Sequence, residues 1–248
     1  MSFTSLEARI GREALLADPF WDSVEVVARF AAREPDVRLL ELLGEYAEPS
    51  KTRGLDIGCA GGRNAVPLAQ AGFDLQALDA SPAMVAKTRE RLAPILGAAE
   101  AERRVRIGSM DDLSDFADAS FDLVVALGIY HCARSREEWD RALSETARVL
   151  EPDGRLLVSV FTPETDLDGR GTSPVPGEPD IYVMFADGGR HFLVDAERLD
   201  REMARFGLTP VEPTRTARPK TETGRRVSAN GMYRKSSPSP PRAGERAG

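Results

Sequence analysis

The chain has 248 residues, of which 42% are hydrophobic and 29% charged, so it can bury a core as one large or two small domains. Its net charge of -7 combines two unequal regions, because residues 1–214 carry -14 and residues 215–248 carry +7. The acidic region would repel a phosphate backbone, so we expect no nucleic-acid partner. No apolar run approaches the ~20 residues of a membrane span, so we expect no membrane partner. A loop over 162–193 that is sized for a lid favours a small-molecule substrate, with a protein side chain as the alternative.

The cysteine and histidine content excludes further classes of protein. Cys59 and Cys132 are too few for a disulfide scaffold or a four-cysteine zinc site, and His131 and His191 leave little for another metal site. The N-terminus shows no basic start followed by an apolar segment, so we expect no signal peptide. A cytoplasmic protein without a metal is therefore expected, while its oligomeric state is left open.

The pattern of apolar residues changes along the chain. Residues 1–50 are polar with helical spacing, which predicts an N-terminal helical cap. After residue 50, short apolar runs alternate with helices. The strands are expected at 55–57, 75–78, 104–107, 121–127, 156–161, 208–211 and 227–233, and the helices at 64–71, from Ser81-Pro82 to a stop at Pro94 and Gly97, at 136–150 and at 196–206.

Strands that are apolar on both faces and alternate with helices indicate a parallel sheet in a Rossmann-like, doubly wound α/β fold. Ligands bind such sheets beyond the carboxyl ends of the strands. Residues 162–180 are rich in proline and glycine, so we expect no regular element there and a lid-like loop over 162–193. The low-complexity segment 236–248 predicts a disordered tail, which leaves 51–235 as the main domain.

The most informative segment is the turn after the first strand, LDIGCAGGRNA at 55–65. Asp56 ends the strand, and Gly58, Ala60 and Gly62 form a turn of small residues in which a ligand could lie against the backbone. The dinucleotide motif GxGxxG does not fit, because Ala60 and Arg63 stand at glycine positions. Asp56 suits an amine better than a pyrophosphate. The alternative is a tight turn that binds no ligand.

Acidic and apolar residues follow the next strands. Asp79, with Ala80 after it, ends the second strand and is placed to accept hydrogen bonds from ribose hydroxyls, although it could also be a plain strand cap. After the third strand, Met110 offers a soft surface to an adenine ring and Asp111 an acceptor for its amino group. Leu127 ends the fourth strand. Together these positions favour a nucleoside ligand.

With these motifs the chain resembles the class I S-adenosylmethionine-dependent methyltransferases. Asp56, Gly58 and Gly62 match the family's glycine motif, and Asp79 matches its second-strand acid. The chain departs from the family at Ala60, where glycine is usual, and at Ser109, where aspartate is common. Similarity extends over the segments SFDLVVA at 120–126 and LEPDGRLLVSV at 150–160.

This resemblance implies a seven-stranded sheet whose last strand is antiparallel, with S-adenosyl-L-methionine as the cofactor. It also implies that the helices of 1–50 cover the cofactor, where Trp21 could close over the methionine end or simply pack. The cofactor-binding residues are then Asp56, Gly58, Ala60, Gly62, Asp79, Ala80, Met110, Asp111 and Leu127.

Methyl transfer from a sulfonium is an in-line displacement, so the protein mainly positions two reactants and excludes water. His131 lies after a predicted strand end and could act as a general base, or could be a packing residue. Tyr130 is a candidate pocket wall, and Arg190 could meet an acidic group of the substrate or lie on the surface. Two other readings stay open: a nicotinamide-dependent oxidoreductase and a non-catalytic protein that binds an adenosyl ligand.

Overall fold

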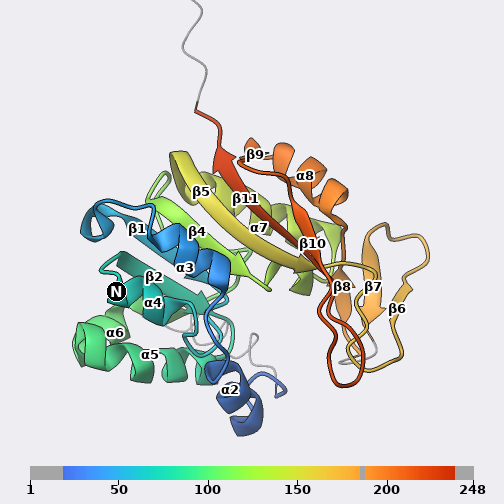
Figure 1. The fold of residues 1–248 in the computed structure, drawn as a ribbon, viewed down its shortest axis with the longest axis horizontal. Helices are drawn as coiled ribbons and strands as arrows, with labels where there is room; N and C mark the ends of the chain where they lie inside the picture. The colour runs from blue at the N-terminus through green and yellow to red at the C-terminus, as the bar shows by residue number, and fades with distance from the viewer. Residues whose placement is uncertain (1–18, 185–187, 238–248) are drawn as a thin grey trace, which may run out of the picture.

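The computed structural model describes residues 19–184 and 188–237, and its centre is one sheet of eight strands (Figure 1). Five parallel strands run in the order β3-β2-β1-β4-β5, and β11 then joins β5 in antiparallel orientation, with β10 and β9 both paired to β11. The strands are β1 (Arg53–Ile57), β2 (Asp74–Asp79), β3 (Val105–Ile107), β4 (Phe121–Leu127), β5 (Leu150–Phe161), β9 (Leu208–Pro210), β10 (Arg215–Ala217) and β11 (Ser228–Lys235).

The predicted Rossmann-like fold and its antiparallel last strand are confirmed. The sheet has one strand more than the predicted seven, since β9 and β10 are separate short strands that both pair with the edge of β11 opposite β5. The order of the parallel strands reverses beside β1, because the chain passes from β1 to β2 on one side and later returns to place β4 on the other. The carboxyl ends of β1 and β4 therefore border the position where a ligand is expected.

Helices cover both faces of this sheet (Figure 1). One buried cluster joins the sheet to α7 and α8, and a second joins it to α3, α4, α5 and α6. The helices are α2 (Val24–Ala31), α3 (Val37–Leu43), α4 (Ala65–Gln70), α5 (Pro82–Leu96), α6 (Ala98–Arg104), α7 (Arg136–Val149) and α8 (Ala196–Ala204), with short 3-10 turns η1 (Pro49–Lys51) and η2 (Tyr130–Cys132).

Local sequence explains where the helix beside the site begins and ends. Ser81 caps α5, because its hydroxyl accepts a hydrogen bond from the N–H of Met84 at 3.1 Å, and Pro82 occupies the first helical position. Gly97, at φ 87°, ends the helix as expected. The chain then forms α6, which the sequence pattern did not predict.

The prediction that residues 162–180 contain no regular element is wrong. A second, antiparallel sheet is formed by β6 (Thr172–Pro174), β7 (Ile181–Met184) and β8 (Arg190–Phe192), and in Figure 1 it lies at one end of the main sheet beside the β10–β11 hairpin. The breakers fall between or at the edges of short strands, where proline costs no ladder hydrogen bond. Ile181, Met184 and Phe192 are buried and hold this accessory sheet (β6–β8) against the main fold.

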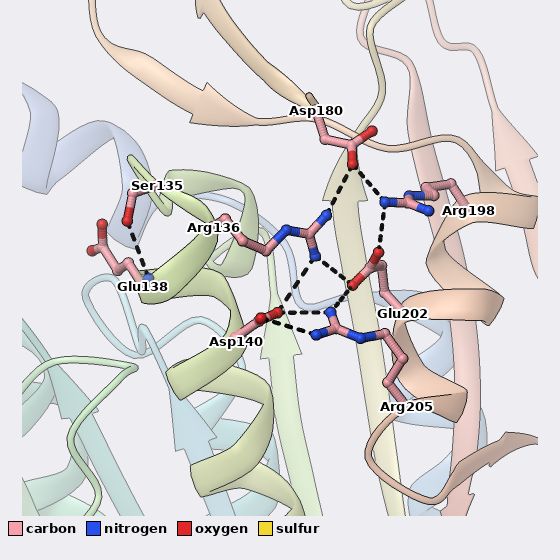
Figure 2. A network of polar contacts seen from close by, with 8 residues as sticks. All are labelled: Ser135, Arg136, Glu138, Asp140, Asp180, Arg198, Glu202 and Arg205. Carbon is pink, nitrogen blue, oxygen red and sulfur yellow. Dashed lines mark hydrogen bonds and ion pairs between the residues drawn. The ribbon is translucent and has the colours of Figure 1, made fainter. Parts of the chain in front are cut away.

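A network of charged side chains anchors the accessory sheet to α7 and α8 (Figure 2). Buried Glu202 on α8 receives Arg136 of α7 at 2.6 Å and Arg205 at 2.5 Å, and the other oxygen lies 3.0 Å from Arg198. Arg136 also binds Asp180, just before β7, at 3.0 Å. Burial alone would raise the pKa of Glu202, but the arginines outweigh burial and the pKa is lowered.

Two sequence predictions fall partly beyond these residues. Positions 1–18 of the expected helical cap and 238–248 of the expected tail lie outside the described residues. Within the described part of the chain, no helix is both long enough and apolar enough to cross a membrane.

Candidate functional site

The turn after β1 is joined to the end of β2. The N–H groups of Gly58 and Cys59 both donate to the carbonyl of Leu78, at 2.9 and 3.0 Å. One carboxylate oxygen of Asp79 accepts the N–H of Ala60 at 2.9 Å, and the other accepts the N–H of Ser81 at 2.9 Å. Burial raises the pKa of Asp79, and these N–H donors oppose the rise. Asp79 thus fixes the turn while each of its oxygens retains capacity to accept one more donor.

The turn itself has an unusual backbone. Four of its residues have positive φ, namely Gly58 at 71°, Ala60 at 44°, Gly61 at 77° and Gly62 at 84°. A Cβ at Gly58 would lie 2.9 Å from the side chain of Ile129, which leaves no room for one. Glycine is therefore required at position 58 for both conformation and space. Ala60 adopts a left-handed backbone conformation. This conformation costs conformational energy for most residues that carry a Cβ, while glycine and asparagine adopt it readily.

Asp56 lies directly beneath this turn as a buried acid. It is 1% exposed, and within the described residues neither carboxylate oxygen has a hydrogen-bond partner. Burial raises its pKa to about 7 and the charge of Asp79 acts in the same direction, while the positive charge of Arg63 and the nearby backbone N–H of Ala65 oppose the rise. A buried carboxylate without a donor is costly, so a cationic group of a ligand would relieve it.

The residues after β3 contribute less than the sequence suggests. Met110 is 5% exposed and packs in the same buried cluster as Leu78. Asp111 accepts a hydrogen bond from Ser109 and forms an ion pair with Arg141 of α7 at 2.7 Å. The predicted contact of Asp111 with an adenine amino group therefore competes with a partner that the acid already has. Ala80 is half-buried beside Asp79 and Leu127 is 8% exposed at the end of β4, at the same edge of the sheet.

Tyr130 is not the pocket wall that the sequence suggested. Its side chain is fully buried in the core, its hydroxyl is 2.6 Å from that of Thr146, and its ring meets Trp139 edge to face. Its hydroxyl and its ring are both engaged by core side chains, so Tyr130 offers no surface to a ligand. The error arises because η2 turns the chain inward directly after Ile129.

His131 lies at the carboxyl end of the sheet, 5% exposed. Its ring stacks on Phe161, the last residue of β5, with 4.1 Å between centroids. Nδ1 of His191 on β8 lies 3.2 Å from the backbone oxygen of His131, so the accessory sheet touches this position. The structure thus brings His131 to the edge that carries the turn, but its role as a base stays a prediction.

Two further expected positions lie away from the turn or have structural partners. Arg190 forms an ion pair with Glu178 and donates to the carbonyl of Arg134 at 3.2 Å, so its charge is already balanced and its predicted contact with substrate gains no support. Trp21 packs edge to face on Phe30, and its closure over a cofactor stays a prediction.

The start of α2 is docked on the start of α5, next to the turn. The hydroxyl of Ser81 donates to Asp22 at 2.6 Å, and the N–H of Ala83 donates to the same carboxylate oxygen at 3.3 Å. This contact holds the N-terminal segment beside the end of β2. Among the described residues, no group of three or more His, Cys, Asp or Glu side chains gathers in a way that could hold a metal ion.

Sequence reasoning missed a group of arginines at this edge. Arg33, Arg63 and Arg226 come from three distant segments, and each lies within electrostatic range of the other two. Phe161, which contacts both His131 and Arg226, was also missed. No local motif marks these residues, because only the fold brings them together.

Comparisons with known proteins agree with this geometry. Residues 55–158 match the family model described as a methyltransferase domain. The chain is 29% identical over 155 residues to a ubiquinone biosynthesis O-methyltransferase of Xanthomonas axonopodis pv. citri (strain 306), covering 62% of this chain and 61% of that protein. It is 36% identical over 118 residues to a demethylmenaquinone methyltransferase of Renibacterium salmoninarum, covering 46% and 43%. The chain thus spans less than two thirds of either relative.

A solved structure is similar over most of its length. The Burkholderia thailandensis 1,6-didemethyltoxoflavin-N1-methyltransferase, solved with 1,6-didemethyltoxoflavin and S-adenosylhomocysteine, superposes with a TM-score of 0.57. The match covers 96% of this chain and 92% of that one at 21% identity, so it bears on the fold alone.

Proposed function

We propose that this chain is a class I S-adenosylmethionine-dependent methyltransferase that transfers a methyl group to a small-molecule acceptor. The match of residues 55–158 to a methyltransferase-domain model and the similarity to a ubiquinone biosynthesis O-methyltransferase support this proposal. The observation that carries the proposal is the positive-φ turn after β1, tied to the carboxylate of Asp79 above the buried, unpartnered carboxylate of Asp56. These features lie at the carboxyl edge of the sheet, where such folds bind ligands.

The residues present suit this cofactor. Asp56 needs a donor, which the methionine ammonium would supply, and Asp79 can accept further hydrogen bonds from ribose hydroxyls. The backbone of Gly58, Ala60 and Gly62 would let the methionine end approach closely. The cofactor, when bound, supplies an activated methyl on a sulfonium cation. The acidic side chains of the edge would favour that cation.

For the acceptor we propose a small molecule held between the carboxyl edge and the accessory sheet. One relative is named a ubiquinone biosynthesis O-methyltransferase and another a demethylmenaquinone methyltransferase, which supports a small acceptor. The ion-pair network around Glu202 and the stacking of Trp139 on Phe192 at 4.2 Å hold the accessory sheet in place (Figure 2). A fixed wall positions two reactants and excludes water, which is most of what a methyl transfer requires.

We propose His131 as the group that accepts the acceptor's proton. Its place beyond β4 and its contact with Phe161 support this role. The test is His131→Gln, for which we expect a lower kcat and loss of the acidic limb of the pH–rate profile. An unchanged profile would leave His131 as a packing residue.

The experiment that tests the function measures methyl transfer by the full chain. The protein is incubated with S-adenosylmethionine and a panel of phenols, catechols, amines and thiols, and release of S-adenosylhomocysteine is recorded. Release that depends on one acceptor class supports the proposal. Tight binding of S-adenosylhomocysteine without release across the panel would favour a non-catalytic adenosyl-binding protein. Binding of NAD alone would favour an oxidoreductase.

A further inference from the structure

Three arginine side chains gather at the carboxyl edge of the sheet without carboxylate partners. Arg33 follows α2, Arg63 follows the glycine-rich turn, and Arg226 precedes β11. All three are half-buried. No carboxylate among residues 19–184 and 188–237 lies within ion-pair distance of any of them, whereas arginines elsewhere, such as Arg53 and Arg148, each contact two acids.

Burial and mutual repulsion both lower the pKa of these side chains. Burial, together with the charges of Arg226, Arg63 and Arg29, lowers the pKa of Arg33 to about 10. The pKa of Arg226 is lowered by burial and then by Arg63. Like charges crowded into a partly dry site cost stability unless an anion joins them.

The acid nearest to this group is already engaged. Asp36 attracts Arg63 and Arg226 at longer range, but both of its oxygens accept hydrogen bonds from Arg38, at 2.9 and 2.7 Å. The other nearby acid, Asp56, is buried beneath the turn, and of these three arginines it attracts only Arg63. Neither acid neutralises the three arginines, so a positive site persists at this edge of the sheet.

The backbone fixes Arg226 beside the candidate base. Arg225 and Asp166 exchange backbone hydrogen bonds of 2.9 and 2.6 Å, and the N–H of Arg226 donates to Pro219 at 3.0 Å. The guanidinium of Arg226 lies 5.3 Å from the centroid of the Phe161 ring, on which His131 also stacks. An aromatic surface, a histidine and a positive charge are therefore adjacent where the acceptor is expected.

We propose that Arg33, Arg63 and Arg226 bind an anionic group of the acceptor, a carboxylate or a phosphate, and so select acidic aromatic acceptors. This proposal rests on the proposed function, because it assigns a substrate class to the same site. Guanidinium groups bind such oxyanions through paired, charge-assisted hydrogen bonds. The anion would hold the acceptor ring beside Arg226 and Phe161, with its reactive atom near His131.

The test uses the full chain saturated with S-adenosylhomocysteine and titrated calorimetrically with benzoate and with its uncharged analogue benzamide. We expect benzoate to bind at least tenfold more tightly than benzamide. Arg226→Met should weaken benzoate binding at least tenfold, Arg226→Lys should restore part of it, and S-adenosylhomocysteine affinity should stay within threefold. Arg215→Met, which removes an exposed arginine on β10, should leave benzoate binding within twofold. Unchanged melting temperatures verify that the variants fold.

Three results would overturn the proposal. Equal binding of benzoate and benzamide would remove the anion site, and an equal loss in Arg215→Met would reduce it to general charge. A loss of S-adenosylhomocysteine affinity in Arg226→Met with benzoate binding intact would assign the arginine to the cofactor's carboxylate instead. If the wild-type chain fails to bind S-adenosylhomocysteine, the methyltransferase proposal fails, and titration of the ligand-free protein with benzoate still decides the anion site.

Discussion

The carboxylate of Asp79 accepts the backbone N–H of Ala60 at 2.9 Å, so the acid that ends β2 also holds the turn that follows β1. This single contact gives Asp79 two roles, as a structural brace and as an acceptor for a ligand. Binding and local order at the site are therefore coupled through one side chain.

Replacing Asp79 should weaken the site in both respects. We expect Asp79→Ala to raise the Kd of S-adenosylhomocysteine more than tenfold, or about 1.4 kcal/mol, because charge-assisted hydrogen bonds are lost. Calorimetry measures the change. Asp74→Ala is the matched control, since Asp74 lies at the other end of the same strand and pairs with Arg104 on the surface. An unchanged affinity in Asp79→Ala would refute the assignment to the ribose.

Adding a methyl group at Gly58 should be costlier than adding one at Gly72. Both glycines have positive φ, at 71° and 90°, but a Cβ at Gly58 meets Ile129 at 2.9 Å and one at Gly72 meets nothing within 4 Å. Gly72→Ala should cost about 1 kcal/mol of unfolding free energy for the backbone alone. Gly58→Ala should cost at least about 1 kcal/mol more.

A double-mutant cycle in urea unfolding separates the two contributions at Gly58. Adding Ile129→Ala to Gly58→Ala should recover the part of the cost that comes from the clash. Strict additivity of the two substitutions would show that the contact with Ile129 does not restrict position 58.

Ala60 has a left-handed backbone, at φ 44°. Ala60→Gly should raise the free energy of unfolding by up to about 1 kcal/mol, since the strain at Cβ is removed. Ala119→Gly, at φ 50° outside the site, should give a similar gain. If Ala60 narrows the room for the cofactor, only Ala60→Gly should also tighten S-adenosylhomocysteine binding. A loss of stability in both variants would contradict the strain.

Asp56 should make the ligand-free protein less stable as pH rises. Its pKa is near 3.9 in an unfolded chain and is raised to about 7 by burial in the folded chain. An acid whose pKa is raised on folding contributes stability that is fully present below about pH 4 and is lost as the pH rises through about 7.

Asp56→Asn removes this pH dependence. Relative to wild type, its Tm should be higher at pH 8 than at pH 5 by about 4 °C or more, while its affinity for S-adenosylhomocysteine should fall at least about tenfold. Thermal scans at the two pH values measure the first effect and calorimetry the second. The same Tm difference at both pH values would contradict the buried, titrating carboxylate.

Glu202 should stabilise the protein through the arginines that surround it. Its side chain is 2% exposed, so Glu202→Ala leaves buried positive charge without a partner and should cost about 3 kcal/mol, or roughly 9 °C in Tm. The pKa of Glu202 is lowered in the folded protein. Its contribution to stability is therefore fully present above about pH 4.3, the pKa of glutamate in an unfolded chain, and is lost as the pH falls through the pKa of the folded state.

The control for this network is Glu197→Ala on the same helix, since Glu197 is 84% exposed and, among the described residues, forms an ion pair only with Arg201. That variant should lose less than about 0.5 kcal/mol. Equal losses in the two variants would mean that the network around Glu202 does not anchor α8.

The main sheet could be predicted from sequence because the local pattern of apolar residues marks its parallel strands. FDLVVAL at 121–127 is apolar throughout and forms β4 with those bounds, and Ser81 and Pro82 begin α5 as expected. The accessory sheet could not be predicted in this way. Its strands are three or four residues long and lie among prolines and glycines, so only their packing against Trp139 and neighbouring residues stabilises them.

The residues of the candidate site also fall into those that local sequence places and those that only the fold places. Asp56, Gly58 and Asp79 were predictable because a strand end and a turn place them without further information. Tyr130 was misassigned because η2 turns its side chain into the core, which no pattern in the sequence indicates. The arginine group was invisible because Arg33 and Arg226 are nearly two hundred residues apart and meet only in the folded chain.

The most direct measurement is a calorimetric titration of the full chain with S-adenosylhomocysteine and, in parallel, with NAD. The account predicts saturable one-to-one binding of S-adenosylhomocysteine that Asp79→Ala weakens more than tenfold, about 1.4 kcal/mol, and no binding of NAD. Binding of NAD without binding of S-adenosylhomocysteine would contradict it.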